Sequence, residues 1–411
     1  MRSRLIILLA AGISVFMLTA CGDDTSVTIP EFPLRGTEVP VVSSTPDPAE
    51  FSSSPINEIT EEDQAEQSEE PLVPTEEPPV PTEEPLVPTE EPEESSILYI
   101  TISAAGDVTL GNYYGQELWG SFRDTYDKQK DPAYFFENVY DIFNQDDMTI
   151  VNLEGPLTYA EERREGQPFS MSGDPEYVDI LTAGSVEAVG MGNNHRLDYY
   201  EEGSADTIEV LESAGISYAY DMYTGTYESQ GILIGFISVN EVSQGSRVEK
   251  YLKEGIDSLR EEGCQIILAC CHWGTEREYY PEDYQKSLGK KCIDWGADLV
   301  IGHHPHVLQG IEEYQGKYIV YSLGNFCFGA NRNPPDKDCL IVQQTFAFVE
   351  GEKQEETTFK VIPCSVSSIS KRNDFKPTPA QGEEAQRILD KLNEYSKDFG
   401  LQFDGDGFPV K

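Results

Sequence analysis

Basic residues and histidine are scarce in this sequence. Its 411 residues include 29 lysines and arginines and five histidines, against 74 aspartates and glutamates, which gives a net charge of −45 at pH 7. A protein of this charge repels the phosphate backbone of nucleic acids. We therefore exclude nucleic-acid binding as the function and expect no nucleic-acid partner.

Long apolar runs are also missing beyond the start of the chain. The exception is residues 5–20, which are mainly apolar and follow the two basic residues Arg2 and Arg4. A run of this length is short for a membrane span and typical of a secretory signal. No later segment is apolar enough to cross a bilayer, so the sequence predicts an exported protein without further membrane spans.

The end of that apolar run, Leu18-Thr19-Ala20-Cys21, resembles the lipobox of bacterial lipoproteins. In that family the chain is cut before the cysteine, and the thiol is lipidated. The resemblance implies a signal peptide over residues 1–20, lipidation at Cys21, and a lipid anchor on the extracellular face of the cell membrane. The alternative is an uncleaved anchor, which also leaves the rest of the chain outside the cytoplasmic membrane.

Residues 21–96 are predicted to form a disordered linker. They are rich in proline, glutamate, serine and threonine, and residues 22–96 contain 21 acidic residues and one basic residue. Such a segment cannot bury enough apolar surface to offset its chain entropy. The motif Val-Pro-Thr-Glu-Glu-Pro recurs at 73–78, 80–85 and 87–92, and its prolines exclude a helix. We expect an extended stalk that carries a folded domain at 97–411.

Cysteines at zinc-finger spacing are absent too. Without Cys21, seven cysteines remain, an odd number, and none of them form a pair with that spacing. Cys270 and Cys271 end an apolar run, where a free cysteine is typically a small core residue. We therefore expect few or no disulfides.

The region 97–411 alternates apolar runs with helical patterns, which predicts a layered α/β fold. Several runs are continuously apolar, as in strands that are covered on both faces. The predicted strands are Leu98–Ala104, Thr149–Leu153, Ala188–Gly192, Ile232–Val239, Gln265–Cys271, Leu299–Ile301, Tyr318–Leu323, Ile341–Val349 and Thr357–Val361. The predicted helices are Ala205–Ala214, Val248–Glu261, Pro281–Trp295 and Ala380–Tyr395.

Polar side chains follow these strands where each strand ends, and ligands bind at that edge in α/β sheets. All five histidines stand at such positions, together with acidic and amide residues. These residues are Asp107, Asn152, Glu154, Asn193, Asn194, His195, His272, His303, His304 and His306. The concentration of every histidine at strand ends favours one shared site over scattered structural roles.

Imidazole, carboxylate and amide groups are suitable ligands for Mn, Fe or Zn. His304 and His306 flank a proline and can both face one site, and Asp107 and Glu154 can share or bridge two ions. Two metal ions about 3.5–4 Å apart can hold an attacking hydroxide and the oxygens of a phosphoryl group. A neighbouring histidine that binds no metal can then protonate the leaving oxygen. The residues thus favour a site with divalent metal ions, two of them if this arrangement applies.

Six segments contain these polar residues and their neighbours. They are Gly106-Asp107-Val108-Thr109-Leu110-Gly111, Asn152-Leu153-Glu154-Gly155-Pro156-Leu157, Asn193-Asn194-His195, His272-Trp273-Gly274-Thr275-Glu276, Gly302-His303-His304-Pro305-His306 and Tyr321-Ser322-Leu323-Gly324-Asn325-Phe326. In this order and spacing they resemble the CapA family, which is named for poly-γ-glutamate capsule biosynthesis. The resemblance covers about 97–400 and implies a calcineurin-like metallophosphatase fold, in which two packed β-sheets are flanked by helices.

The resemblance also implies a role for each site residue. The implied metal ligands are Asp107 on the first metal, Glu154 as the bridge, Asn194 and His272 on the second metal, and the pair His304 and His306. His195 is the implied acid or phosphate-orienting residue. The implied supporting or substrate-contacting residues are Asn152, Asn193, Glu276, His303 and Asn325, of which Glu276 is also a candidate ligand.

Two positions depart from the general phosphatase pattern. Thr109 replaces the histidine of Asp-x-His, and Glu154 replaces the bridging aspartate. Three hypotheses therefore stay open. The protein takes part in making, exporting or anchoring poly-γ-glutamate or a similar anionic polymer, with membrane capsule-synthase subunits as implied partners. In the second hypothesis, it is a metal-dependent hydrolase of a phosphoester or of the polymer. In the third, it is a polymer-binding scaffold without catalytic activity.

Overall fold

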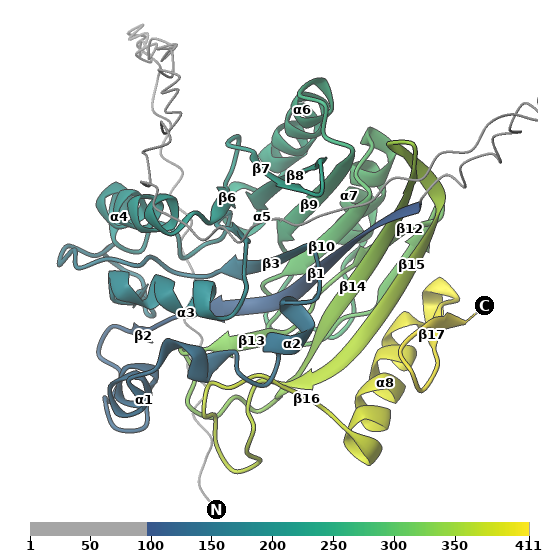
Figure 1. Cartoon of the computed structure of the whole chain (residues 1–411). Helices are drawn as coiled ribbons and strands as arrows, with labels where there is room; N and C mark the ends of the chain where they lie inside the picture. Colours follow the sequence, from purple (N-terminus) through teal and green to yellow (C-terminus); the bar gives the residue numbers. More distant parts are fainter. Residues whose placement is uncertain (1–96, 411) are drawn as a thin grey trace, which may run out of the picture. The chain divides into compact units, whose positions relative to one another are not determined.

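Two β-sheets pack face to face in the computed structural model of the protein, which describes residues 97–410 (Figure 1). The first sheet is parallel from β1 to β6 and antiparallel from β1 to β16. In spatial order it contains β16 (Thr378–Pro379), β15 (Glu352–Ser365), β14 (Asp338–Val349), β1 (Ile97–Thr109), β3 (Met148–Leu153), β5 (Ala188–Gly190) and β6 (Ser217–Ala219), with β13 (Asn325–Phe328) paired to the end of β1.

The second sheet has a parallel centre and antiparallel edge strands. In spatial order it contains β11 (Ile311–Tyr314), β12 (Lys317–Val320), β10 (Leu299–His303), β9 (Ile266–His272), β8 (Ile232–Asn240) and β7 (Gly225–Ser229). Two short pairs complete the strands: β2 (Asn112–Tyr113) with β4 (Met171–Ser172), and β17 (Gln402–Phe403) with β18 (Pro409–Val410).

Helices cover the outer faces of the sandwich. Helices α1 to α4 pack on the outer face of the first sheet, α6 and α7 pack on the second, and α8 adds to the core between the sheets. Their bounds, with the short α5, are α1 (Phe122–Gln129), α2 (Tyr140–Phe143), α3 (Val178–Ala183), α4 (Tyr200–Ala214), α5 (Glu241–Gln244), α6 (Arg247–Glu261), α7 (Asp283–Trp295) and α8 (Gly382–Ser396).

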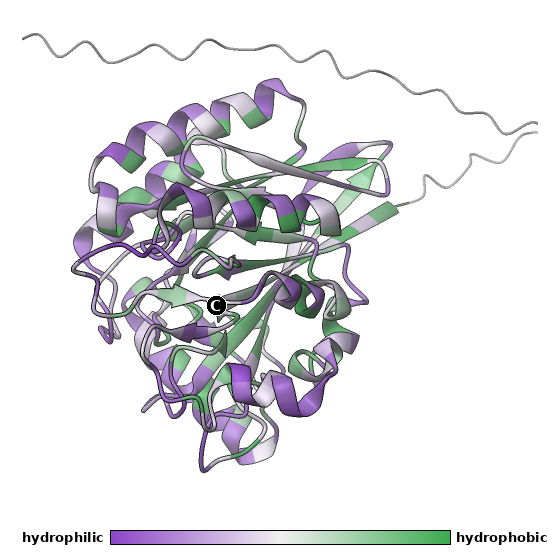
Figure 2. Ribbon diagram, turned by 90° about the vertical axis from the view of Figure 1, so that its left-hand side faces the viewer, coloured by the Kyte–Doolittle hydropathy of each residue, from purple (hydrophilic) through white to green (hydrophobic). Residues whose placement is uncertain are grey.

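The apolar strands are explained by burial on both faces. In β9, Ile266, Leu268 and Cys270 point into the core between the sheets, and the residues between them contact α6 and α7. Side chains alternate across a strand, so a strand covered on both faces needs apolar residues at every position. Figure 2 shows this distribution, with mainly hydrophobic strands inside and helices that carry hydrophilic residues on much of their surface.

The predicted fold class is confirmed: two packed sheets are flanked by helices. Each predicted strand and helix overlaps an observed one, although the strand predicted for 318–323 already ends at Val320 in β12. All seven cysteines at 264–364 are buried and free. Within 97–410, no helix is long and apolar enough to cross a bilayer. The predicted signal peptide, Cys21 and linker lie outside the described residues.

Candidate metal centre

Strand register brings the polar strand ends together. Asp107 on β1 is the register partner of Asn152 on β3 and of Asn325 on β13, so three neighbouring strands present polar side chains at one level. The Asp107 amide donates to the Gly324 carbonyl at 3.0 Å. At Gly106, a Cβ atom would lie 2.0 Å from that same carbonyl oxygen, so glycine is required for this close approach.

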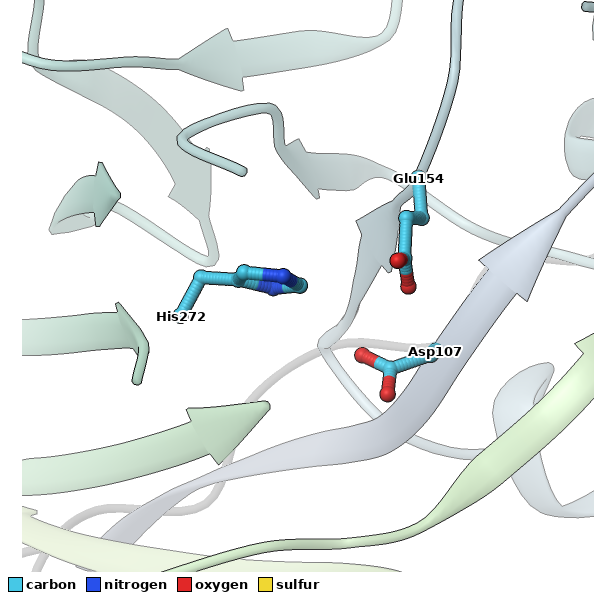
Figure 3. Close-up of side chains that lie close together, drawn as sticks. All are labelled: Asp107, Glu154 and His272. Atoms are coloured by element: carbon cyan, nitrogen blue, oxygen red, sulfur yellow. The ribbon is translucent and has the colours of Figure 1, made fainter. Parts of the chain in front are cut away.

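Three buried side chains form the centre of the site. Asp107, Glu154 and His272 each offer a ligand atom, and these atoms all lie within 4.8 Å of one another. The two carboxylates belong to the first sheet and the connection that follows it, and His272 ends β9 of the second sheet. Figure 3 shows the three side chains pointing toward one another across the space between the sheets. This is a donor set that suits Mn, Fe or Zn.

His306 lies against both carboxylates. Its Nδ1 atom is 3.1 Å from the Asp107 carboxylate, and its Nε2 atom is 3.6 Å from that of Glu154. Burial lowers the pKa of His306, but the two carboxylates outweigh this effect and raise it to about 10. Asn325 fixes the ring, since its Oδ1 atom is 3.0 Å from His306 Nδ1 and its Nδ2 group donates to the His306 carbonyl.

His304 faces the same site from the loop after β10. Its ring centroid is 4.8 Å from that of His272 and 5.7 Å from that of His306. His304 and His306 both have positive φ angles, +93° and +57°. Such backbone is uncommon outside glycine and is found preferentially at functional sites, where surrounding contacts hold it. The loop after β10 therefore brings His304 and His306 to the same site, as the sequence predicts.

Asn194 and His272 form the second candidate ligand pair. Asn194 Oδ1 is 2.8 Å from His272 Nε2. Burial lowers the pKa of His272 well below its usual value, and burial also lowers that of His304, to about 4. Both rings are therefore neutral at pH 7, and neutral imidazole is the form that binds metal ions.

Two unsatisfied buried atoms support a cation at this site. Glu154 Oε1 and His304 Nδ1 are buried and have no hydrogen-bond partner in the described structure. A buried carboxylate oxygen or imidazole nitrogen is costly without a partner, and a metal ion would satisfy both. Burial also raises the pKa of Glu154 to about 7, whereas the contacts with His306 hold that of Asp107 below its usual value despite burial. The residues present therefore fit a metal ion.

His195 is supported by an aspartate that the sequence analysis did not identify. His195 Nδ1 lies 2.7 Å from Oδ2 of the buried Asp198, and Nε2 lies 3.8 Å from Glu154 Oε1. The Met171 amide donates to the same Asp198 oxygen at 2.7 Å. Burial lowers the pKa of His195, but the Asp198 hydrogen bond and the nearby carboxylates raise it above its usual value. Asp198 follows His195 by three positions, but an aspartate in a polar loop gives no local signal of this contact.

The predicted supporting residues differ in how closely they approach the centre. Asn152 Nδ2 donates to Asp107 at 2.9 Å, and Asn193 contacts Asn152 and the His195 amide. The His303 ring instead lies 3.2 Å from the Ala105 carbonyl, as an adjacent residue rather than part of the central group.

Glu276 and Thr109 stand apart from this group. Glu276 is exposed on the turn after β9 and lines the same cleft as His195 and His306, without a hydrogen bond or ion pair to either. Thr109 is buried, and its hydroxyl faces the Met171 sulfur at 3.8 Å. The position that holds histidine in the general pattern therefore contributes no ligand here.

The described residues form a helix-flanked β-sandwich with buried Asp, Glu and His at its strand ends, as expected for a metallophosphatase-like fold. The chain belongs to the family described as "Bacterial capsule synthesis protein PGA_cap", which matches residues 101–330. This result confirms the expected CapA family.

The chain is similar to two named relatives. It is 29% identical over 282 residues to "PGA biosynthesis protein CapA" of Bacillus subtilis, covering 63% of this chain and 72% of the relative. It is 24% identical to "Capsule biosynthesis protein CapA" of Bacillus anthracis, covering 59% of this chain and 63% of that one, which is less than two thirds of the relative's length. A Thermus thermophilus structure titled as a hypothetical protein aligns with a TM-score of 0.39 and 15% identity over 64% of this chain and 99% of that one.

Proposed function

We propose that this protein acts at the cell envelope in the synthesis, export or anchoring of poly-γ-glutamate or a related anionic polymer, through a metal-dependent phosphatase-like site. Membership of the capsule synthesis family and the names of its relatives support the polymer. The observation that carries the metal-dependent part is the buried Asp107, Glu154 and His272 group with its unsatisfied neighbouring atoms.

The contacts among the site residues support a proposed set of metal ligands. A bound divalent metal would act as a Lewis acid that polarises an oxygen of the substrate and lowers the pKa of water. Mn, Fe and Zn all suit the donor set. The residues proposed to hold one or two ions are Asp107, Glu154, Asn194, His272, His304 and His306.

His195 is proposed as the proton donor. Asp198 fixes the Nδ1 side of the ring, so the Nε2 atom is directed toward Glu154 and the cleft. A raised pKa favours the protonated ring, from which the proton can be transferred to a leaving oxygen. This pair favours, as the second candidate function, a hydrolase of a phosphoester or of the polymer itself.

Genetic complementation tests the proposed function. In Bacillus subtilis without its own CapA, this chain should restore surface poly-γ-glutamate, and Asp107→Asn should not, because it removes a charged ligand. Asp257→Asn, the same change at the surface of α6, is the matched control. The polymer is measured as glutamate released by acid hydrolysis of the cell-bound fraction, with immunoblots to verify equal protein. Restoration by Asp107→Asn would reject the metal-dependent role, and failure of the unaltered chain would reject the polymer role.

The lipid anchor is tested separately. Cys21→Ala should abolish lipidation, because only the cysteine thiol accepts the lipid, and should move the protein into the aqueous phase of a detergent extraction. Mass spectrometry of the membrane form should show a lipidated N-terminal cysteine. Membrane partitioning of the Cys21→Ala variant would instead support the uncleaved anchor.

A further inference from the structure

We propose that the cleft beside the metal centre binds an extended polycarboxylate through Arg277 and Arg372, two arginines contributed by different sheets. The inference rests on the proposed function, because it specifies how the anionic polymer is held. Arg277 lies on the turn after β9 of the second sheet, and Arg372 lies on the connection after β15 of the first. Both line one cleft with His195 and His306.

The cleft is large enough for several residues of a polymer. Its volume is about 760 Å³, and His195, His306 and Asn325 connect it to the metal centre. Away from these residues, Trp119 lines the cleft with 69% of its side chain exposed. An exposed tryptophan provides an apolar surface for the methylene groups of a polymer whose carboxylates are bound elsewhere. The cleft thus offers both apolar and polar contacts outside the reacting position.

Besides the histidines of the site, the basic residues that line this cleft are three arginines: Arg277, Arg332 and Arg372. The guanidinium group of Arg332 already has partners within the protein, since it pairs with Glu117 at 3.1 Å and donates to the Trp119 carbonyl at 2.7 Å. The guanidinium groups of Arg277 and Arg372 have no hydrogen bond or ion pair among the described residues. Arg372 adds to the lowering of the pKa of Asp124, but that carboxylate forms its ion pair with Lys128, which is the main cause of the shift. In a chain with 74 acidic and 29 basic residues, two arginines without acidic partners in one cleft are notable candidates for an external anion.

The acids of the cleft do not cancel these charges. Glu117 is paired with Arg332, and Asp336 is paired with Lys391 at 2.5 Å. Glu276 is the remaining acid, and it faces the metal centre closely enough to affect the pKa values of Glu154 and His306. Among the acids and arginines that line the cleft, those without an ion pair are therefore Glu276, Arg277 and Arg372, which leaves a net positive charge, opposite in sign to the protein as a whole, and favours an anionic occupant.

The backbone around Arg277 is fixed to the histidine loop. Arg277 has a positive φ of +64°, and its amide donates to the Pro305 carbonyl at 2.8 Å, between His304 and His306. Gln309 donates to the next carbonyl, that of Glu278, also at 2.8 Å. A non-glycine residue in this conformation is held by its surroundings. The turn therefore presents the arginine at a set position beside the metal ligands.

The backbone around Arg372 is fixed in a similar way. Its carbonyl accepts hydrogen bonds from Lys337 Nζ and Ser367 Oγ, both at 2.9 Å. The following residue, Asn373, is buried and donates to the carbonyls of Phe328 and Asn331, which belong to the cleft wall. Two fixed backbone positions with exposed arginine side chains suit a ligand that carries carboxylates at intervals along a chain.

Binding of poly-γ-glutamate of narrow length distribution to the full chain tests this inference. Titration calorimetry of the manganese-loaded protein should show an affinity that falls about five- to tenfold in Arg277→Gln and in Arg372→Gln, because each loses a charge-assisted contact. Arg277→Lys should lose less, since it keeps the charge. Arg247→Gln, a surface arginine on α6 outside this cleft, is the matched control and should bind normally. Metal content should be the same in all variants.

The outcomes separate this inference from the proposed function. If the unaltered chain binds the polymer and both Gln variants bind equally well, the cleft assignment is wrong while the polymer role stands. If the unaltered chain restores surface polymer in cells but does not bind it in solution, the inference is also rejected. Preference for polyphosphate over poly-γ-glutamate would overturn the carboxylate assignment.

Discussion

At the scale of single residues, the surroundings of each histidine in the site decide whether it carries a charge. His272 and His304 are neutral because they are buried among other histidines, whereas His306 is held protonated by the two carboxylates beside it. Histidines within one site thus differ in charge, two of them neutral and one positive. A cation that replaced the His306 proton would release it, so we expect metal uptake to be stronger at higher pH.

The Asp198→Asn variant tests the support of His195. It should lower the pKa of His195, because the charge and the hydrogen bond of Asp198 oppose the effect of burial. The ring titration is followed by NMR in the metal-free protein, and metal content of the loaded protein should stay unchanged. Asp257→Asn serves as the control. An unaltered His195 titration would show that Asp198 does not act on this ring.

At the residue scale the sequence identified most of the site but not all of it. Asp107, Glu154 and His272 were predictable because they follow apolar runs at a sheet edge. Asp198 was not, since it lies within a polar loop before α4, where an aspartate is unremarkable. Its burial arises from the folding of the 155–171 connection over it, and the Met171 amide contact shows this. That contact is a tertiary one and has no local pattern.

At the scale of elements, burial on both faces made the central strands predictable. Their continuous apolar runs reflect cores on either side. The short strand β13 was not predicted, although it pairs with the end of β1 and carries Asn325 to the site. Its existence depends on a partner more than 200 residues away, so four residues of sequence cannot indicate it.

An acidic residue before β3 predicts how stability depends on pH. Burial raises the pKa of Asp146 to about 7 from a usual value of 3.8, and its Oδ1 atom is buried without a partner. Between these two values the unfolded chain holds fewer protons at this position than the folded one. The stability that protonated Asp146 contributes is therefore lost as pH rises from about 4 to about 7.

The Asp146→Asn variant removes that titration. The difference in melting temperature, variant minus unaltered protein, should rise from pH 5 to pH 8, because only the unaltered protein has to ionise a buried acid at position 146. Thermal unfolding followed by circular dichroism at both pH values measures the difference, and other titrating groups cancel in the comparison. The same offset at both pH values would contradict the burial argument.

At the scale of the whole molecule, the site exists because two sheets meet. The first sheet and its connections supply Asp107, Glu154 and Asn194, and the second supplies His272, and His304 from the loop after β10. Neither half holds a complete ligand set. The order and spacing of the motifs predicted the family and the site, but only the packing of the sandwich shows which side chains are close enough to share an ion.

Elemental analysis of the full chain, purified without chelator, tests the central claim most directly. The account predicts one or two Mn, Fe or Zn ions per chain, which His304→Ala loses in part or completely because it removes an imidazole whose buried Nδ1 atom has no hydrogen-bond partner among the described residues. His303→Ala is the matched control, since its ring faces a backbone carbonyl, and it should retain the metal. Equal metal in both variants, or no metal in the unaltered chain after reconstitution, would contradict the metal centre.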